Sequence, residues 1–381
     1  MSPAGGCCSG FVGHAGSAAG GRHPAVLPPG PGFLAAGGGA AGGAAYVRPR
    51  EGNPVPGISV VIPAYNAEAV LRTTLERLAA QDYPPDRYEV LVVDDGSTDG
   101  TAEVVQQAAR SLPVRYLPQP HRGRAAARNA GARAARFGVL LFLDADVWAE
   151  PQLLAAHARH HRDGSRVGVQ GPSFTHPDSK RTPFMEVKEM FPDLTPRRAH
   201  DLSPYHVVTR NFSVRAEDLW AVGGFDESFA GYGWEDIELG FRLRKAGVRL
   251  RWEPQARAWH YHVEDLKTAR RKQVEAGRGA VYFWTKHGRP FGLGMFLELH
   301  PLVRPLKWLV YRSGILTPGV QAVLHVAERA LRSAVGLRRK VWLAVASECY
   351  CHLLWHGYYE GVWAALQEIS PDARGPGRRV R

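Results

Sequence analysis

Cysteine is scarce in this sequence, and its spacing excludes folds and metal sites that depend on it. The chain of 381 residues has four cysteines, an adjacent pair (Cys7 and Cys8) near the start and a second pair (Cys349 and Cys351) near the end. These spacings fit neither a zinc-binding pattern nor a disulfide framework. We therefore expect a protein of a reducing compartment.

Long apolar runs are also missing. No stretch reaches the roughly 18 consecutive apolar residues of a membrane-spanning helix, and the sequence does not open with a charged start followed by an uninterrupted apolar segment, as a secretory signal would. The sequence therefore predicts a cytoplasmic protein, either free or peripheral on the inner face of the cell membrane.

Large apolar side chains are rare in residues 1–55, where runs such as GPGFLAAGGGAAGGAA prevail. Such a segment cannot bury enough apolar surface to offset its ordering entropy, so it predicts a disordered tail. The whole chain is nevertheless 45% hydrophobic, as in a folded protein. Its formal net charge of +12 favours an anionic partner without choosing among a nucleotide, a phospholipid surface and a nucleic acid.

From Ile58 onward, short β-branched runs alternate with segments of helical periodicity. The expected strands lie at 58–66, 90–93, 114–120 and 139–147, and the expected helices at 68–81, 101–110 and 123–136. This alternation is typical of an α/β protein with a Rossmann-like, mostly parallel sheet and helices on both faces.

Polar clusters follow three of the expected strands, namely PAYN (63–66), DDGSTDG (94–100) and DAD (144–146). Ligands bind beyond the carboxyl ends of strands in such sheets. Asp144 and Asp146 repel each other unless a cation lies between them, and their hard oxygens suit Mg²⁺ or Mn²⁺ with phosphate completing the shell. Each motif alone also occurs in turns and helix caps and is therefore not specific. Their combination predicts a metal-bridged diphosphate site. PAYN replaces the Gly-x-Gly-x-x-Gly turn of a dinucleotide-binding oxidoreductase.

The motifs VVIPAYN, VLVVDDGSTDGT, AARNAGARAA and LLFLDAD, in this order, resemble those of family 2 glycosyltransferases over residues 58–150. GGFDESFAGYGWEDIELGFRLRKAGVRL and ARAWHYH are similar to a catalytic segment of galactosyltransferase-like enzymes and extend the resemblance to residue 262. The resemblance implies a GT-A fold and an inverting transfer of sugar from a nucleoside-diphosphate sugar, most often a UDP-sugar.

The resemblance also implies the residues of the donor site. Pro63 and Tyr65 would line the nucleotide pocket, with the Tyr65 ring against the base, and Asp95 would accept a hydrogen bond from the base edge. Arg128 would lie near the diphosphate, although a surface arginine is the alternative.

For the ion, Mn²⁺ or Mg²⁺, the resemblance implies Asp144 and Asp146 as ligands, with Asp144 also near the donor, and His260 as a third ligand. His262 is the alternative to His260. The ion would neutralise charge on the departing diphosphate.

The segment GYGWEDIELG contains the acids of the second half. The family pattern implies that Asp236 is the catalytic base and that Glu235 is a second catalytic, acceptor or structural contact, whereas Glu238 would favour the positive end of a helix. Trp234 departs from the family's small residue and is either an acceptor platform or a packed aromatic. Two further residues, Asn211 and Ser213, would lie near the donor sugar.

Residues 266–372 are rich in basic and aromatic side chains at helical spacing. Two interpretations remain open, a helical layer on an anionic membrane and a subdomain packed on the catalytic domain of residues 56–265. Residues 373–381 form a basic tail.

The expected partners are a nucleoside-diphosphate sugar and a glycan or lipid-linked acceptor, with no nucleic acid. The alternative function is a catalytically inactive nucleotide- or membrane-binding protein on the same scaffold.

Overall fold

The computed structural model describes residues 55–179, 182–190, 200–229, 231–300, 305, 308–312, 314 and 316–369. All but the last residue of the predicted disordered tail lies outside the described residues, and so does the predicted basic tail. The predicted domain limits at residues 55, 265 and 372 stay predictions.

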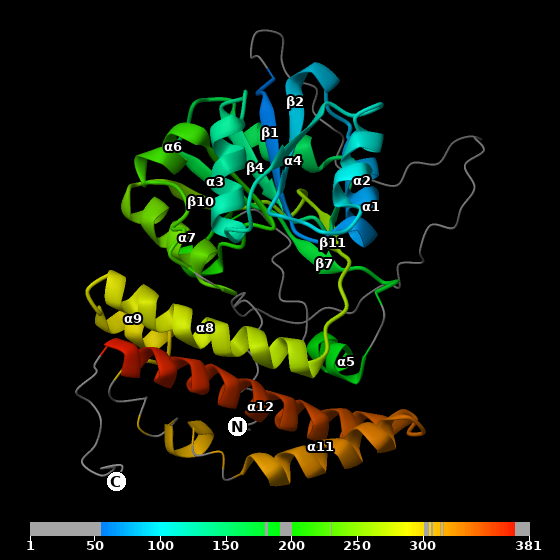
Figure 1. The fold of residues 1–381 in the computed structure, drawn as a ribbon, viewed down its shortest axis with the longest axis vertical. Helices are drawn as coiled ribbons and strands as arrows, with labels where there is room; N and C mark the ends of the chain where they lie inside the picture. Colours follow the sequence, from blue (N-terminus) through cyan, green and yellow to red (C-terminus); the bar gives the residue numbers. More distant parts are fainter. Residues whose placement is uncertain are drawn as a thin grey trace.

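An eight-stranded sheet lies at the centre of the larger layer of the molecule (Figure 1). In spatial order its strands are β3 (Val114–Pro118), β2 (Tyr88–Asp94), β1 (Ile58–Ala64), β4 (Val139–Leu143), β9 (Asn211–Arg215), β6 (Val167–Gln170), β10 (Arg249–Trp252) and β8 (His200–Asp201). The four strands from β3 to β4 are parallel, as are β6 and β10. The predicted α/β fold with a mainly parallel sheet is confirmed, but β9 runs antiparallel to both β4 and β6.

Helices cover both faces of this sheet because successive strand residues point to opposite sides. Val60, Val90 and Leu141 pack on the face covered by α1 (Glu68–Ala79), α2 (Thr101–Ala108) and α4 (Leu153–Ala158). Val61, Leu91 and Leu140 pack on the other face, under α3 (Arg124–Ala134), α6 (Ala216–Ala221) and α7 (Glu235–Lys245). Short 3₁₀ turns, which complete this layer, are η2 (Pro85–Arg87), η3 (Arg159–His161) and η4 (Pro204–His206).

A second sheet of three short strands lies beside the first. Its order is β5 (Val147–Ala149), β11 (Ala258–His260) and β7 (Ser173–Thr175). β11 is antiparallel to β5, with His260 opposite Val147. This register brings the end of β11 next to the residues that follow β4.

A separate helical layer follows in the sequence, with α12 between α8 and α11 (Figure 1). Its elements are α8 (Leu266–Lys286), α9 (Phe291–Phe296), the π-helix η5 (Trp308–Arg312), α11 (Thr317–Leu331) and α12 (Gly336–Ile369), and α5 (Pro183–Met190) joins them. The axes of α8 and α12 approach closely at two glycines, since a Cβ at Gly277 would collide with the carbonyl oxygen of Tyr358, and one at Gly361 with that of Val274. No helix formed by the described residues combines the length and apolar character needed to cross a bilayer.

Candidate active site

Residues that precede β9 meet residues that follow β4 at one end of the sheet. Leu143 lies opposite Asn211 in the antiparallel pair, so the chain before Asn211 runs beside the chain after Leu143. The backbone N–H of Asp144 donates to the carbonyl oxygen of Arg210 at 3.4 Å. Thr209 and Arg210 therefore lie next to Asp144 at the carboxyl end of β4, where sheets of this kind bind ligands.

Arg128, on α3, lies among three carboxylates and only 2% of its side chain is exposed. Its Nη2 donates to Asp144 Oδ1 at 3.0 Å. Its Nη1 donates to Glu235 Oε1 at 3.1 Å and to Asp236 Oδ1 at 3.2 Å. Burial opposes its charge, but the three carboxylates outweigh burial and raise the pKa of Arg128. In this arrangement the guanidinium holds the three acids together, and its predicted contact with a diphosphate stays a prediction.

Asp236 is held by a residue that precedes β9. Thr209 donates to it twice, from its backbone N–H to Oδ2 at 3.0 Å and from its hydroxyl to Oδ1 at 2.5 Å. The Asp236 side chain is 18% exposed, whereas that of Glu235 is 5% exposed. Burial raises the pKa of Asp236 above its ordinary value, and the neighbouring Glu235 adds to this against the charge of Arg128. Of these two adjacent acids, Asp236 is thus the more accessible, and its raised pKa favours it as a proton acceptor.

The two other residues singled out around α7 have structural contacts. Trp234 precedes the helix in a left-handed conformation (φ 74°). Its indole Nε1 donates to the carbonyl oxygen of Ala276 at 2.6 Å, and its ring packs near Phe283 and Phe296. Of the two alternatives for Trp234, these contacts favour the packed aromatic, and its role as an acceptor platform stays a prediction. Glu238 is fully buried and bonds to side chains of α7 and of the α8 region, namely Arg242, Lys286 and His287.

The loop before α7 is attached from both sides. Arg124 and Lys272 lie 4.9 and 4.8 Å from the centroid of the exposed Tyr232 ring. The Tyr232 backbone N–H donates to Glu275 on α8 at 2.8 Å. Gly233 has φ +95°, a conformation that favours glycine. This loop therefore joins the helical layer to the acid cluster.

Asp146 and His260 are brought together by the pairing of β11 with β5. His260 Nε2 lies 3.1 Å from Asp146 Oδ2, and the backbone N–H of Tyr261 donates to the carbonyl oxygen of Asp146 at 2.9 Å. Burial opposes the charge of Asp146, but the hydrogen bond from His260 and the nearby positive charge of Arg210 outweigh it and lower the pKa. His262 stacks on His260 with the ring centroids 4.0 Å apart.

The structure juxtaposes two of the three predicted metal ligands, Asp146 and His260, whereas Asp144 is hydrogen-bonded to Arg128. Within the part of the chain that is described, no group of three or more His, Cys, Asp or Glu side chains has the arrangement of a metal centre. A carboxylate oxygen beside an imidazole nitrogen fits Mn²⁺. Arg210 Nη1 lies 3.2 Å from His260 Nδ1, and since arginine can only donate, we assign the imidazole proton to Nε2. An ion bound at Nε2 therefore requires Arg210 to move.

The residues predicted to hold a nucleoside lie after β1 and β2. Pro63 is within β1, and the ring of Tyr65 is 51% exposed and 4.4 Å from that of His121. Tyr65 is therefore free to receive a base on its exposed surface. Asp95 is buried, and its oxygens already accept from four groups, namely Gln119 Nε2, the His121 ring and the backbone N–H groups of Arg122 and Gly123. Its predicted bond to a base edge would displace one of these donors, and its observed role is to shape the loop at 119–123.

Asn211 and Ser213 do not face the acid cluster, so their prediction near the donor sugar is wrong. Both side chains are buried in β9 against α4 and η3. His157 bonds to both, with Nδ1 2.9 Å from Ser213 Oγ and Nε2 2.9 Å from Asn211 Oδ1. His161 Nε2 is 2.9 Å from the same hydroxyl. The chain of bonds is satisfied when His161 and His157 are both neutral and donate from Nε2.

Acidification is expected to destabilise the protein through this buried network. Burial lowers the pKa of His157 to about 4 and that of His161 to about 3. The unfolded chain takes up protons below about pH 6.5 but the folded chain does not, so stability is full above that pH and falls as the pH drops toward 4, by about 2 kcal/mol per histidine at pH 5. Urea denaturation of wild type and His157→Gln at pH 7.5, 6 and 5 measures this. Between pH 7.5 and pH 5, the free energy of unfolding of the variant should fall about half as much as that of wild type. An equal fall in both proteins would contradict this assignment.

Three further residues of the cluster, Thr209, Arg210 and Arg124, were not singled out in the sequence. Arg124 Nη2 lies 3.6 Å from Glu235 Oε1. Its position one helical turn before Arg128 placed it on the same face of the expected helix at 123–136, and this spacing was the available signal. Thr209 and Arg210 carried no signal, because they precede a strand and only its antiparallel direction brings them to the site.

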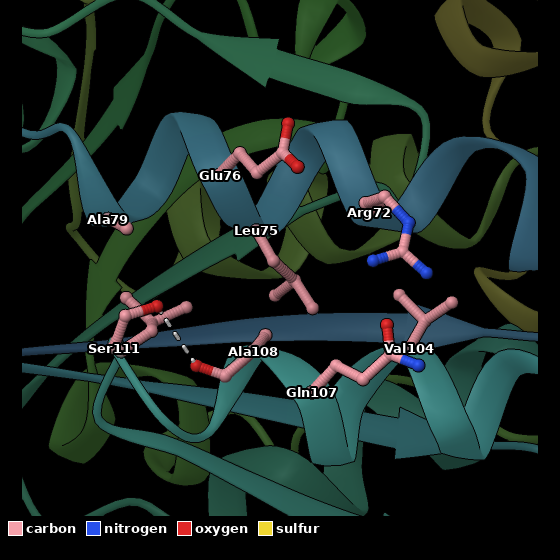
Figure 2. Close-up of a pocket in the computed structure, with 9 residues that line it drawn as sticks. Arg72, Leu75, Glu76, Ala79, Val104, Gln107, Ala108 and Ser111 are labelled. Atoms are coloured by element: carbon pink, nitrogen blue, oxygen red, sulfur yellow. Dashed lines mark hydrogen bonds between the residues drawn. The ribbon is translucent and has the colours of Figure 1, made fainter.

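A groove of about 270 Å³ lies elsewhere, between α1 and α2. Figure 2 shows Leu75 between the two helices, with Arg72 and Gln107 toward one end and Ser111 toward the other. The hydroxyl of Ser111 donates to the carbonyl oxygen of Ala108 at 3.5 Å. None of the predicted site residues lines this groove, which separates it from the acid cluster.

Two family models match the sequence. Residues 59–223 match the model of glycosyl transferase family 2, and residues 202–266 match the model described as the N-terminal domain of galactosyltransferase. Together they span the acid cluster and the Asp146–His260 pair.

Curated relatives include validoxylamine A glucosyltransferase of Streptomyces hygroscopicus subsp. limoneus, which is 40% identical over 240 residues, covering 54% of this chain and 52% of the relative. Chondroitin synthase of Escherichia coli is 29% identical over 245 residues, covering 56% of this chain and 36% of the relative. The chain thus spans about half or less of the length of these relatives.

Among solved structures, the mannosyltransferase PcManGT of Pyrobaculum calidifontis, in complex with GDP-Man and Mn²⁺, aligns with a TM-score of 0.54 at 20% identity, covering 81% of this chain and 88% of that chain. TarS of S. aureus aligns with a TM-score of 0.51 at 18% identity, covering 79% and 55%. These likenesses identify the fold. Residues 59–223 of the chain therefore match glycosyl transferase family 2, and the sheet with its surrounding helices has the GT-A fold.

Proposed function

We propose that the protein transfers a glycosyl group from a nucleoside-diphosphate sugar to a hydroxyl acceptor, with inversion and with the help of a divalent ion. In this reaction the acceptor oxygen forms a bond to the anomeric carbon, and the bond from that carbon to the diphosphate oxygen breaks. The hydroxyl proton passes to a carboxylate, and the diphosphate leaves with the electron pair.

One observation carries this proposal: Asp236 is a partly exposed carboxylate held by Thr209 and Arg128 beside Asp144, at the ligand-binding end of the sheet. A base must be oriented before it can accept a proton from an attacking hydroxyl, and the contacts from Thr209 fix both oxygens. Its raised pKa strengthens it as a proton acceptor. Glu235 has the structural position in this proposal, because its side chain is nearly inaccessible.

The diphosphate would lie near Asp144, Asp146 and His260. Asp146 and His260 would hold the ion, with Asp144 close by, and a bound divalent ion would neutralise charge on the leaving diphosphate. PcManGT, which shares the fold, was solved in complex with GDP-Man and Mn²⁺, and this supports the use of a divalent ion. Arg210, displaced from His260, would retain a positive charge next to the phosphates.

The donor is proposed to be UDP-glucose, since the relative from S. hygroscopicus is a glucosyltransferase and a UDP-sugar is the commonest donor implied by the sequence. The base would stack on Tyr65, above Pro63. The acceptor class is a glycan or lipid-linked hydroxyl, and the proposed location is the cytoplasm.

Release of nucleoside diphosphate tests the proposal. The protein is incubated with UDP-glucose, UDP-galactose and GDP-mannose, each with MnCl₂ and with EDTA, and water serves as the acceptor when no sugar is added. We expect release from one donor that falls at least about tenfold in EDTA, and NMR of the released sugar should show the inverted anomer. Binding of a donor without any release under either condition would instead favour the catalytically inactive scaffold.

A further inference from the structure

The outermost helix of the helical layer has an apolar stripe that its neighbour only half covers. On α11, Leu324, Ala327 and Leu331 are buried against α12. At 100° per residue, Val323 and Val326 lie on the adjacent sector of the helix, and they are 48% and 56% exposed. Gly319 and Ala322, also exposed, lie in the same sector. The apolar stripe is therefore about twice as wide as packing on α12 requires.

The turn that joins α11 to α12 continues this apolar character. Val335 and Leu337 are 79% and 77% exposed, and Val341, one helical turn after Leu337, is 54% exposed. Figure 1 shows α11 on the side of α12 away from the sheet, with this turn at the end where the two helices join. We call the six exposed residues the α11–α12 apolar face: Leu316, Val323, Val326, Val335, Leu337 and Val341.

Positive charge predominates in the segment that carries this face. From residue 316 to residue 347 the sequence has one acid, Glu328, which is half-buried and accepts a hydrogen bond from the Tyr350 hydroxyl at 2.5 Å. Four basic side chains of the same segment are exposed: Arg329, Arg332, Arg338 and Lys340. A ligand of this face should therefore be apolar at its centre and negatively charged around it.

This charge selects among the possible occupants. A second copy would bring the same cations against themselves. The chain's own terminal segments are also basic: residues 1–54 contain three arginines and one acid, and residues 370–381 contain four arginines and one acid. An anionic phospholipid surface has the required chemistry, with acyl chains beneath negatively charged headgroups, and each nearby Lys or Arg contributes about 1 kcal/mol to such binding.

We propose that the α11–α12 apolar face binds the surface of an anionic bilayer, with α11 lying in the interface and its valines below the headgroups. The helices do not cross the bilayer. This inference is independent of the sugar transfer proposed above, because no residue of the acid cluster takes part in it.

Co-sedimentation with vesicles of phosphatidylcholine alone, and of phosphatidylcholine with 30% phosphatidylglycerol, tests the proposal on the full chain. We expect at least about tenfold stronger binding to the anionic vesicles, weakened by salt. The double variant Val323→Glu with Val326→Glu should bind the anionic vesicles at least about tenfold more weakly than the control variant, Gln321→Glu with His325→Glu. The control adds the same charge to the exposed polar side of the same helix.

Circular dichroism and nucleotide-sugar hydrolysis should be unchanged in both variants. Equal loss of binding in the two variants would show that the valines do not insert below the headgroups. Absence of binding of the wild-type protein to anionic vesicles would overturn the proposal. A dimer in light scattering that only the Val323/Val326 variant dissociates, without vesicle binding, would assign the face to self-association. Binding to polyglutamate but not to vesicles would assign it to an acidic protein.

Discussion

Replacement of Asp236 by asparagine is expected to reduce kcat for nucleotide-sugar turnover by about 10²- to 10⁴-fold, the range for loss of a positioned general base. The side chain keeps its shape but loses its proton acceptor. The substitution also leaves a donor facing a donor, because an amide cannot accept from both Thr209 and Arg128 with the two oxygens that now do so. We expect a modest loss of stability, about 1–2 kcal/mol. The variant should therefore stay folded, and its donor affinity, measured by calorimetry, should remain within a few fold of that of wild type.

The neighbouring acid supplies the matched control. Glu235→Gln removes a carboxylate from the same helical turn and from the same guanidinium, but that carboxylate is nearly inaccessible. It should therefore retain a much larger share of kcat than Asp236→Asn. If Glu235→Gln were the inactive variant and Asp236→Asn remained active, the assignment of the base would be reversed.

The pH profile adds a second measurement. Asp236 must be ionised to accept a proton, and its pKa is raised, chiefly by burial. The rate should therefore fall as the pH drops through a value above the ordinary pKa of an aspartate, about 3.9. Glu235→Gln removes a neighbouring negative charge that raises this pKa, so it should move the acidic limb to lower pH, which a purely structural role for Asp236 would not produce.

The fold was largely predictable because hydrophobic periodicity reports burial directly. The expected strands at 58–66 and 139–147 contain all of β1 and β4, and the carboxylates that follow β4 were found from their position after that strand. The direction of β9 was not predictable. A run such as NFSVR is buried in a parallel or an antiparallel strand alike, so the sequence pattern cannot tell which of its ends reaches the site.

This ambiguity explains why Thr209, which holds Asp236, was passed over. The resemblance selected Asn211 and Ser213 instead, which point into the core beside His157. The carboxylate contacts of Arg128 were missed for a related reason. Its charge and its place on a helix suit a phosphate, but its three carboxylate partners come from segments 16 to 108 residues away, and no local pattern shows that they converge.

Replacement of Arg128 by methionine is expected to be among the most destabilising single changes in the layer that contains the eight-stranded sheet. It would leave Asp144, Glu235 and Asp236 close together with no buried counter-charge, and breaking a buried ion pair in this way typically costs about 3–5 kcal/mol. Arg133→Met is the control on the same helix. The Arg133 side chain is 61% exposed, and its distance to Glu227 is 3.7 Å, so its loss should cost below about 1 kcal/mol.

The pH dependence of the Arg128→Met defect separates charge repulsion from a loss of packing. The charge of Arg128 lowers the pKa of Asp236, so without the guanidinium the folded-state pKa of Asp236 would rise further above its unfolded value, near 4. The folded variant then takes up a proton that the unfolded chain does not, so its stability relative to wild type is greater at low pH and is lost as the pH rises through the raised pKa. Urea denaturation should accordingly show a smaller gap between wild type and variant at pH 5 than at pH 7.5. A gap of the same size at both pH values would mean that Arg128 acts through packing, and that the cluster does not depend on its charge.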